Sequence, residues 1–240
     1  MTLLGSLPRL RRGREVETRG PVRPRRIALH NIVKEYHTAV GVRRVLDGIS
    51  FDIEAGEKIA VLGKNGAGKS TLVKIIGGVE NATSGTVSRD LFMSWPIAFA
   101  GGFESTMSGF DNIRFIARIY GVPLKDAVAF IDDFAELGRL LYLPVRTYSS
   151  GMRARLAFGL TLAVNFECFL IDEVISVGDT RFQQKCFDEL FVKRAHCSMI
   201  LVSHDAAIIK QYCKKALILK SGRGRVIDDL EFALQIYHTL

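Results

Sequence analysis

The sequence predicts an α/β domain built around a mostly parallel sheet. Three short apolar runs, at residues 59–62, 168–172 and 198–202, suit strands that are buried on both faces. Helical patterns follow the first two runs, at residues 68–77 and 180–193. Strands that alternate with helices are typical of parallel sheets, and 240 residues are enough for one such domain.

The segment between the first strand and its helix carries a phosphate-binding motif. Residues 63–70 match the pattern G-x-x-x-x-G-K-[ST] at every fixed position: Gly63, Lys64, Asn65, Gly66, Ala67, Gly68, Lys69 and Ser70. The glycines let backbone N–H groups approach phosphate oxygens, Lys69 places a positive charge on the β- and γ-phosphates, and Ser70 offers a hydroxyl to Mg²⁺. The alternative is a chance glycine-rich turn, and the adjoining strand and helix argue against it.

Most of the excess positive charge lies in residues 1–26. Eight arginines against two glutamates give this segment +6 of the formal net charge of +8. We predict a flexible basic arm, which contacts anionic lipid or nucleic acid or is simply a solvated tail. Residues 27–240 are only mildly basic, so the overall charge does not predict a nucleic-acid-binding face on the folded part.

Cysteine and hydrophobicity patterns exclude several classes of protein. The four cysteines form no C-x-x-C pair and no histidine lies at metal-ligand spacing, so reduced thiols in the cytosol are expected. No apolar run approaches the ~18 residues of a membrane span, and residues 1–4 are too short for a signal-peptide core. We therefore expect that the chain alone does not cross a membrane.

Further elements surround the motif in the first half of the chain. An alternating strand at residues 27–34 precedes Tyr36, and a strand pair is expected around residues 44–53. Tyr36 offers a flat face for an adenine, although a packed surface tyrosine is the simpler interpretation. The elements expected next are a strand at residues 85–88 and core-forming helices near residues 111–120 and 124–137.

In the second half, three small residues open an apolar helix predicted at residues 154–164. Ser149, Ser150 and Gly151 suit either an ordinary helix N-cap or an anion-binding helix end. The closing elements are predicted strands at residues 215–219 and 225–227, and a helix at residues 229–237.

Candidate catalytic side chains end two of the apolar strands. Asp172 is placed to hold Mg²⁺, and the adjacent Glu173 can orient or deprotonate an attacking water. His204 follows the strand at residues 198–202. A lone histidine is commonly structural, but ligands bind at this edge of open α/β sheets.

The order of these motifs resembles the ATP-binding cassette of ABC transporters over residues 27–240. Within that superfamily, the chain is similar to the KpsT-type ATPase subunits of capsular polysaccharide exporters, which are related to O-antigen and teichoic acid export ATPases. The segments that carry this likeness are Ser94-Trp95-Pro96, Ala100-Gly101-Gly102-Phe103, Tyr148-Ser149-Ser150-Gly151-Met152-Arg153, Asp172-Glu173-Val174 and Val177-Gly178-Asp179. The resemblance implies a mostly parallel core sheet, an antiparallel β subdomain and a helical subdomain at about residues 104–150.

The resemblance also implies which residues bind ATP and Mg²⁺. Residues 63–71 become the Walker A loop, which adds Thr71 to the nucleotide ligands. Tyr36 then stacks on the adenine, while Ser70 and Asp172 hold the metal.

Catalytic roles follow from the same resemblance. Glu173 is implied to be the general base and His204 the switch histidine, with Lys69 on the phosphates. Asp179 is implied to be the D-loop acid. The signature that contacts the γ-phosphate of ATP held by the other subunit consists of Ser149, Ser150 and Gly151.

The sequence departs from the family pattern at two sites. The usual signature Leu-Ser-Gly-Gly-Gln is Tyr-Ser-Ser-Gly-Met here, a form that the polysaccharide exporters share. The loop that normally supplies a glutamine to Mg²⁺ and water offers Glu104, whose carboxylate cannot donate a hydrogen bond. The basic arm of residues 1–26 also lies beyond the pattern.

The implied function is ATP hydrolysis that powers polysaccharide export across the inner membrane. A homodimer is expected, because a helix N-terminus from a second subunit shields the γ-phosphate from water. The resemblance implies two copies of a polytopic permease, peripheral attachment through it at the cytoplasmic face of the bacterial inner membrane, and no nucleic-acid partner.

Two other functions stay open at this point. One is a soluble ABC-type ATPase that acts on nucleic acid or ribosomes through the basic arm. The other is a P-loop kinase or GTPase, against which the helix start at Ser149 and the pair Ser203-His204 argue.

Overall fold

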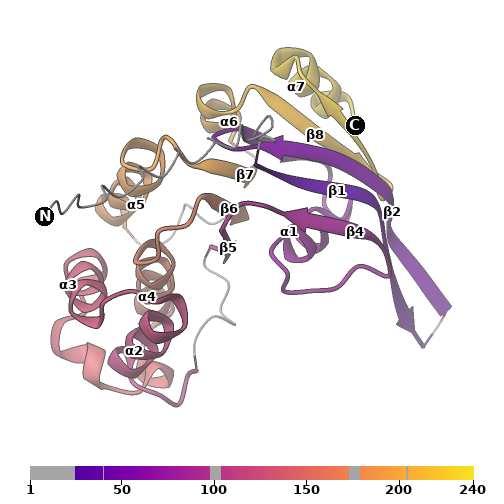
Figure 1. Ribbon diagram of the computed structural model, residues 1–240. Coiled ribbons are helices and arrows are strands. Elements are labelled where there is room, and N and C mark those ends of the chain that lie inside the picture. Colours follow the sequence, from indigo (N-terminus) through magenta and orange to yellow (C-terminus); the bar gives the residue numbers. More distant parts are fainter. Residues whose placement is uncertain (1–24, 40, 98–103, 173–178, 204) are drawn as a thin grey trace, which may run out of the picture.

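A six-stranded sheet lies at the centre of the computed structural model, which describes residues 25–39, 41–97, 104–172, 179–203 and 205–240 (Figure 1). Its strand order is β5-β6-β7-β3-β8-β9. The first five strands in this order run parallel and β9 runs antiparallel to β8, which confirms the predicted mostly parallel sheet. The strands are β3 (Lys58–Leu62), β5 (Met93–Pro96), β6 (Cys168–Asp172), β7 (Ser198–Val202), β8 (Lys215–Lys220) and β9 (Arg223–Ile227).

A second, antiparallel sheet packs against one face of the central sheet. It has the order β2-β1-β4 and consists of β1 (Arg26–Thr38), β2 (Gly41–Glu54) and β4 (Ser84–Arg89). The strand pair expected around residues 44–53 is instead the single long strand β2, which pairs with β1. This pairing places Arg43 directly opposite Tyr36.

Most helices lie on the other face of the central sheet or beyond its edge (Figure 1). In the picture α2, α3 and α4 gather in one group, away from the antiparallel sheet. The α-helices are α1 (Lys69–Ile76), α2 (Gly109–Tyr120), α3 (Leu124–Ala135), α4 (Ser150–Leu162), α5 (Thr180–Phe187), α6 (Ala206–Tyr212) and α7 (Leu230–Thr239). Two 3₁₀ helices, η2 (Gly138–Tyr142) and η3 (Val145–Thr147), and one π-helix, η4 (Asp188–Val192), complete the described helices.

Strand β3 divides the protein interior into two hydrophobic cores. Ile59 and Val61 point into the core shared with α1 and the antiparallel sheet. Ala60 and Leu62 point into the core shared with α2, α3, α4 and α5. Successive side chains of a strand point to opposite faces, so this apolar run is buried on both sides, as predicted.

Several element boundaries differ from the sequence-based expectation. The helix predicted at residues 124–137 ends at Ala135, because Glu136 adopts a left-handed conformation with φ 54°. The helix predicted at residues 180–193 changes from α to π at Asp188. The helix predicted from residue 154 begins at Ser150, and β5 and α6 were not predicted.

Candidate nucleotide site

The phosphate-binding motif forms a tight loop between β3 and α1. Gly66 and Gly68 have left-handed φ angles of 81° and 105°. A Cβ atom on Gly68 would lie 2.8 Å from Cδ2 of Leu46, so glycine is required where the loop passes the β1–β2 hairpin. Among the described residues no side chain caps the first turn of α1, and its N–H groups can therefore bind an anion.

Lys69 folds back into this loop. Its Nζ donates hydrogen bonds to the carbonyl oxygens of Gly63, at 2.7 Å, and Lys64, at 3.3 Å, and the residue is only 8% exposed. No carboxylate in the described part of the chain forms an ion pair with it. A buried ammonium that has no counter-ion in the described part of the chain is costly, so the loop is suited to receive negative charge.

A pocket of about 590 Å³ opens beside the loop. The β1–β2 hairpin forms one wall and the phosphate-binding loop with the start of α1 forms the other. The residues that line it are Tyr36, Thr38, Arg43, Val45, Asn65, Gly66, Gly68, Lys69, Ser70 and Thr71. The structure thus brings Tyr36 together with most of the predicted loop residues, and it adds Thr38, Arg43 and Val45, which sequence reasoning missed.

The ring of Tyr36 is held in place at the pocket wall. Burial raises the pKa of its hydroxyl, as does a hydrogen bond with Glu80, and a hydrogen bond with Thr71 acts in the opposite direction. The Nζ atom of Lys34 lies 5.0 Å from the ring centroid and 2.9 Å from Oε1 of Glu80. Because Thr71 is in the first turn of α1, this tyrosine is fixed next to the phosphate-binding loop.

Asp172 ends strand β6, and its residue partner on β7 is Val202. Strands β3, β6 and β7 are parallel, so Asp172 lies at the same carboxyl edge of the sheet as the phosphate-binding loop. Glu173 and His204 lie outside the described residues, as do the predicted loop and turn residues within 98–103 and 173–178.

Glu104 lies at the start of the segment that leads into α2. Its Oε1 accepts hydrogen bonds from the backbone N–H, at 3.0 Å, and the hydroxyl, at 2.9 Å, of Thr106. Both bonds lower the pKa of the Glu104 carboxyl, and the bond from the backbone N–H has the larger effect. The side chain is therefore held against its own loop in this structure.

The predicted signature residues form an exposed helix start, away from the nucleotide pocket. Ser149 is the N-cap of α4, and its Oγ accepts a hydrogen bond from the N–H of Met152 at 3.2 Å. Ser149 and Ser150 are exposed. A Cβ atom on Gly151 would find no atom nearer than 4.0 Å, so packing within the chain does not require this glycine.

Asp179 caps the amino end of α5. Its Oδ1 accepts a hydrogen bond from the N–H of Phe182, and its Oδ2 accepts one from Nη2 of Arg155, both at 2.9 Å. The pKa of Asp179 is lowered, chiefly by the backbone N–H of Phe182.

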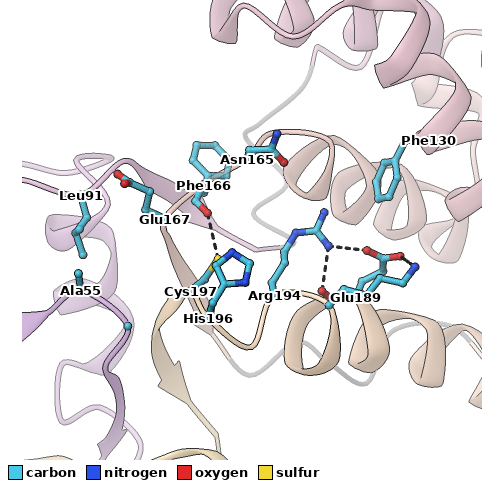
Figure 2. Close-up of a pocket in the computed structure, with 12 residues that line it drawn as sticks. Ala55, Leu91, Phe130, Asn165, Phe166, Glu167, Glu189, Arg194, His196 and Cys197 are labelled. Atoms are coloured by element: carbon cyan, nitrogen blue, oxygen red, sulfur yellow. Dashed lines mark hydrogen bonds and ion pairs between the residues drawn. The ribbon is translucent and has the colours of Figure 1, made fainter.

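A second pocket, of about 610 Å³, lies at the opposite edge of the central sheet (Figure 2). Residues that precede β3, β6 and β7 line it, including Ala55, Glu167 and Cys197. Figure 2 shows Arg194 in the middle of this pocket, bonded to the buried Glu189. It contains no phosphate-binding loop, and we assign the nucleotide to the first pocket.

The parts of the chain that the structure describes contain no group of three or more histidine, cysteine, aspartate or glutamate residues arranged to hold a metal ion. None of their helices has the length and apolar character needed to span a bilayer.

Comparisons of this chain with known proteins all indicate the same family. The family described as "ABC transporter" matches residues 46–176. The capsule polysaccharide export ATP-binding protein CtrD of Neisseria meningitidis serogroup B is 52% identical over 89% of this chain and 99% of its own length. The ATP-binding protein BexA of Haemophilus influenzae is 50% identical over 88% of this chain and 98% of its own length. The polysialic acid transport ATP-binding protein KpsT of Escherichia coli is 41% identical over 88% of this chain and 98% of its own length.

Solved structures agree on the fold. A dimeric ATP-binding cassette in a post-hydrolysis state, bound to ADP and phosphate, superposes with a TM-score of 0.71 at 20% identity. The superposition covers 84% of this chain and 98% of that one. The relatives CtrD, BexA and KpsT favour the transporter function over the nucleic-acid and kinase alternatives. The chain belongs to the ABC transporter family, and the predicted ATP-binding cassette fold and ATPase activity are confirmed.

Proposed function

We propose that this chain hydrolyses ATP to drive export of capsular or other cell-surface polysaccharide across the bacterial inner membrane. The observation that carries the nucleotide part is the buried ammonium of Lys69, which donates to two carbonyl oxygens of the phosphate-binding loop and has no carboxylate partner among the described residues. The functions of CtrD and KpsT, capsule polysaccharide export and polysialic acid transport, support the choice of cargo.

The pocket geometry supports a definite orientation of ATP. The adenine stacks on Tyr36, and the phosphates enter the loop, where Lys69 turns from its backbone carbonyls toward the β- and γ-phosphates. The hydroxyl of Ser70 and the carboxylate of Asp172 are the hard oxygen ligands that Mg²⁺ prefers, and both belong to this edge of the sheet. Bound there, Mg²⁺ would neutralise charge on the phosphate oxygens.

Hydrolysis then requires a base and a second subunit. Glu173 follows Asp172 directly and accepts a proton from the attacking water, while His204 contacts the reacting phosphate. Ser149 of the partner subunit brings its helix start to the γ-phosphate. The exposure of this helix end within one chain supports this role, since the end stays accessible for a partner.

A permease partner fits the exposed apolar face of α2. Phe115 and Ile119 are 55% and 56% exposed, and the nearby Phe92 is 45% exposed. Side chains of this size at the surface favour a protein contact. We propose that two copies of a membrane permease bind a dimer of this chain here, at the cytoplasmic face of the inner membrane.

The test is a Glu173→Gln substitution in cells that carry no other copy of this chain. Surface and cytoplasmic polysaccharide are measured separately. We expect polysaccharide to accumulate inside, because Glu173→Gln slows turnover by roughly 10²–10⁴-fold if the glutamate is the base. The matched control is Glu231→Gln, the same change at an exposed residue of α7 that pairs with Lys210. Unchanged surface polysaccharide in the Glu173→Gln strain would contradict the proposal.

A further inference from the structure

Lys34 of β1 lies against the aromatic ring of Tyr36. Its Nζ is 5.0 Å from the ring centroid, within the range of a cation–π contact, and its side chain is only 14% exposed. Residues two apart on a strand point to the same face, so these two side chains meet. Tyr36 lines the nucleotide pocket but Lys34 does not, and the ammonium therefore leaves the space for a base free.

Two partners fix this ammonium, and both belong to the segment between α1 and β4. The Nζ atom lies 2.9 Å from Oε1 of Glu80, and it donates to the carbonyl oxygen of Asn81 at 2.8 Å. Burial raises the pKa of the Glu80 carboxyl, but hydrogen bonds from the Tyr36 hydroxyl and from Lys34 outweigh it and lower the net pKa. Glu80 thus holds both the hydroxyl of the ring and the cation that lies over the ring.

The segment that supplies these partners is itself tied to β1. The N–H of Thr83 donates to the carbonyl oxygen of Val33 at 2.8 Å, and the N–H of Glu35 donates to Oγ1 of Thr83 at 2.9 Å. At the other end of α1, Thr71 forms a hydrogen bond with the Tyr36 hydroxyl. The ring is therefore connected to both ends of the helix that begins at the phosphate-binding loop.

We propose that Lys34 is a positioning residue for nucleotide binding, which holds the ring of Tyr36 in the orientation that stacks on the adenine. Lys34 does not line the pocket, so its effect on ATP passes through the ring. A ring that is already fixed loses no rotamer freedom when the base binds, and this raises the affinity. The inference rests on the proposed stacking of adenine on Tyr36.

The competing interpretation is an ordinary ion pair between Lys34 and Glu80 that contributes only to local stability. The two interpretations differ in what Lys34→Met does to the folded protein. A positioning role weakens ATP binding by about 3- to 10-fold, because the ring must then be ordered when the base binds. A purely structural role lowers the melting temperature and leaves the ATP affinity of the folded molecules unchanged.

The experiment uses the purified full chain, titrated by calorimetry with ATP and with inorganic tripolyphosphate in the presence of Mg²⁺. Tripolyphosphate has the phosphates of ATP but no base, so a loss that passes through Tyr36 should affect ATP alone. We expect Lys34→Met to keep its tripolyphosphate affinity within about twofold. In ATPase assays its KM should rise in step with the loss of ATP affinity, with kcat within about twofold.

The matched control is Lys215→Met. Lys215 forms a similar ion pair, 2.8 Å from Glu57, and is 19% exposed, but it lies at the opposite edge of the central sheet. This variant tests the general cost of breaking a half-buried pair, and it should bind ATP as the unmodified chain does. Lys34→Arg keeps a cation that can lie over a ring and pair with Glu80, so it should retain ATP affinity within about twofold.

A double-variant cycle tests whether Lys34 acts through the ring. Tyr36→Ala should weaken ATP binding by about 5- to 150-fold, since it removes the stacking surface. In that background Lys34→Met should cause no further loss, because the ring that it positions is gone. If Lys34→Met does not fold, Glu80→Gln removes the counter-ion of Lys34 and should show the same loss that is specific to ATP, with Glu57→Gln as its control.

Three results would overturn the proposal. The first is an ATP affinity of Lys34→Met within twofold of the unmodified chain. The second is an equal loss for tripolyphosphate, which would show that the charge of Lys34 acts on the phosphates. The third is an undiminished effect of Lys34→Met in the Tyr36→Ala background. Unchanged ATP affinity of Tyr36→Ala would remove the adenine stacking and this inference together, whereas absence of ATP hydrolysis by the unmodified chain would contradict the proposed function itself.

Discussion

Replacing Arg194 with methionine should destabilise the protein strongly, whereas the same change at its neighbour Lys193 should not. Both cations contact the carboxylate of Glu189, which is 8% exposed. Arg194 is itself 15% exposed and donates to the Oε2 and carbonyl oxygens of Glu189 and to Leu162. Lys193 is 66% exposed and makes one contact with the same carboxylate.

The expected magnitude follows from what each substitution leaves behind. Removing one partner of a buried ion pair costs about 3–5 kcal/mol, and the low end applies here because Lys193 remains. For a chain of this length a loss of about 3 kcal/mol lowers the melting temperature by roughly 6–12 °C. An exposed pair contributes about 0–1 kcal/mol, so Lys193→Met should shift the melting temperature by no more than roughly 4 °C.

The pH dependence of stability gives a second test of the role of Glu189. Burial raises the pKa of Glu189, but hydrogen bonds from Lys193 and Arg194 outweigh it, so the net pKa lies below the ordinary value of 4.5. The stability that the ionised Glu189 contributes is therefore present above that value and is lost as the pH falls through the lowered pKa. In Arg194→Met the pKa of Glu189 should rise, and protonation then removes the buried charge. The loss of stability relative to the unmodified chain should therefore become smaller below about pH 4.5.

Thermal denaturation followed by circular dichroism, at pH 7 and at pH 4, measures both effects. Equal destabilisation by Arg194→Met and Lys193→Met, or a deficit that widens at pH 4, would refute the assignment of Glu189 as a buried carboxylate held mainly by Arg194.

Three further predictions concern the nucleotide pocket and the cysteines. Lys69→Ala should weaken binding of a fluorescent ATP analogue by about 10- to 150-fold, because a charged hydrogen bond contributes about 1.5–3 kcal/mol; unchanged affinity would exclude contact with the phosphates. Arg43→Ala should weaken the same binding several-fold, since Arg43 lines the pocket, whereas Arg44→Ala should not, since that arginine pairs with Glu35 and Asp47; equal effects would count against a contact between Arg43 and ATP. Burial raises the pKa of Cys168 to about 12, so a thiol reagent at pH 8 should label it only after unfolding, and rapid labelling of the native protein would contradict the packing around β6.

Local patterns were sufficient to predict the central sheet and the phosphate-binding loop. Each of β3, β6 and β7 contains an uninterrupted run of four apolar residues, and strands that are buried on both faces show this pattern in any context. Strand β5 was missed because it is short and contains Pro96, and because its pairing depends on a distant contact. The hydroxyl of Ser94 accepts a hydrogen bond from the N–H of Leu170 there.

The pocket wall could be predicted only in part. The aromatic ring of Tyr36 and the family resemblance together predict its place in the pocket, but Arg43 reaches the same wall through the register of β1 with β2, which no local pattern contains. The change from α to π helix at Asp188 was missed for a similar reason. The helical pattern continues through this segment, and the buried contact of Glu189 with Arg194 forms only in the folded protein.

The alternation of β3 between the two cores has a genetic consequence. A lesion at Ile59 or Val61 disturbs the layer that carries Tyr36, whereas one at Ala60 or Leu62 disturbs the layer that carries α4. Second-site suppressors of neighbouring β3 alleles should therefore fall into two separate groups. Compensating changes for Val61 are expected in β1, β2 and α1, and those for Ala60 in the helical layer, although the two residues are adjacent in the gene.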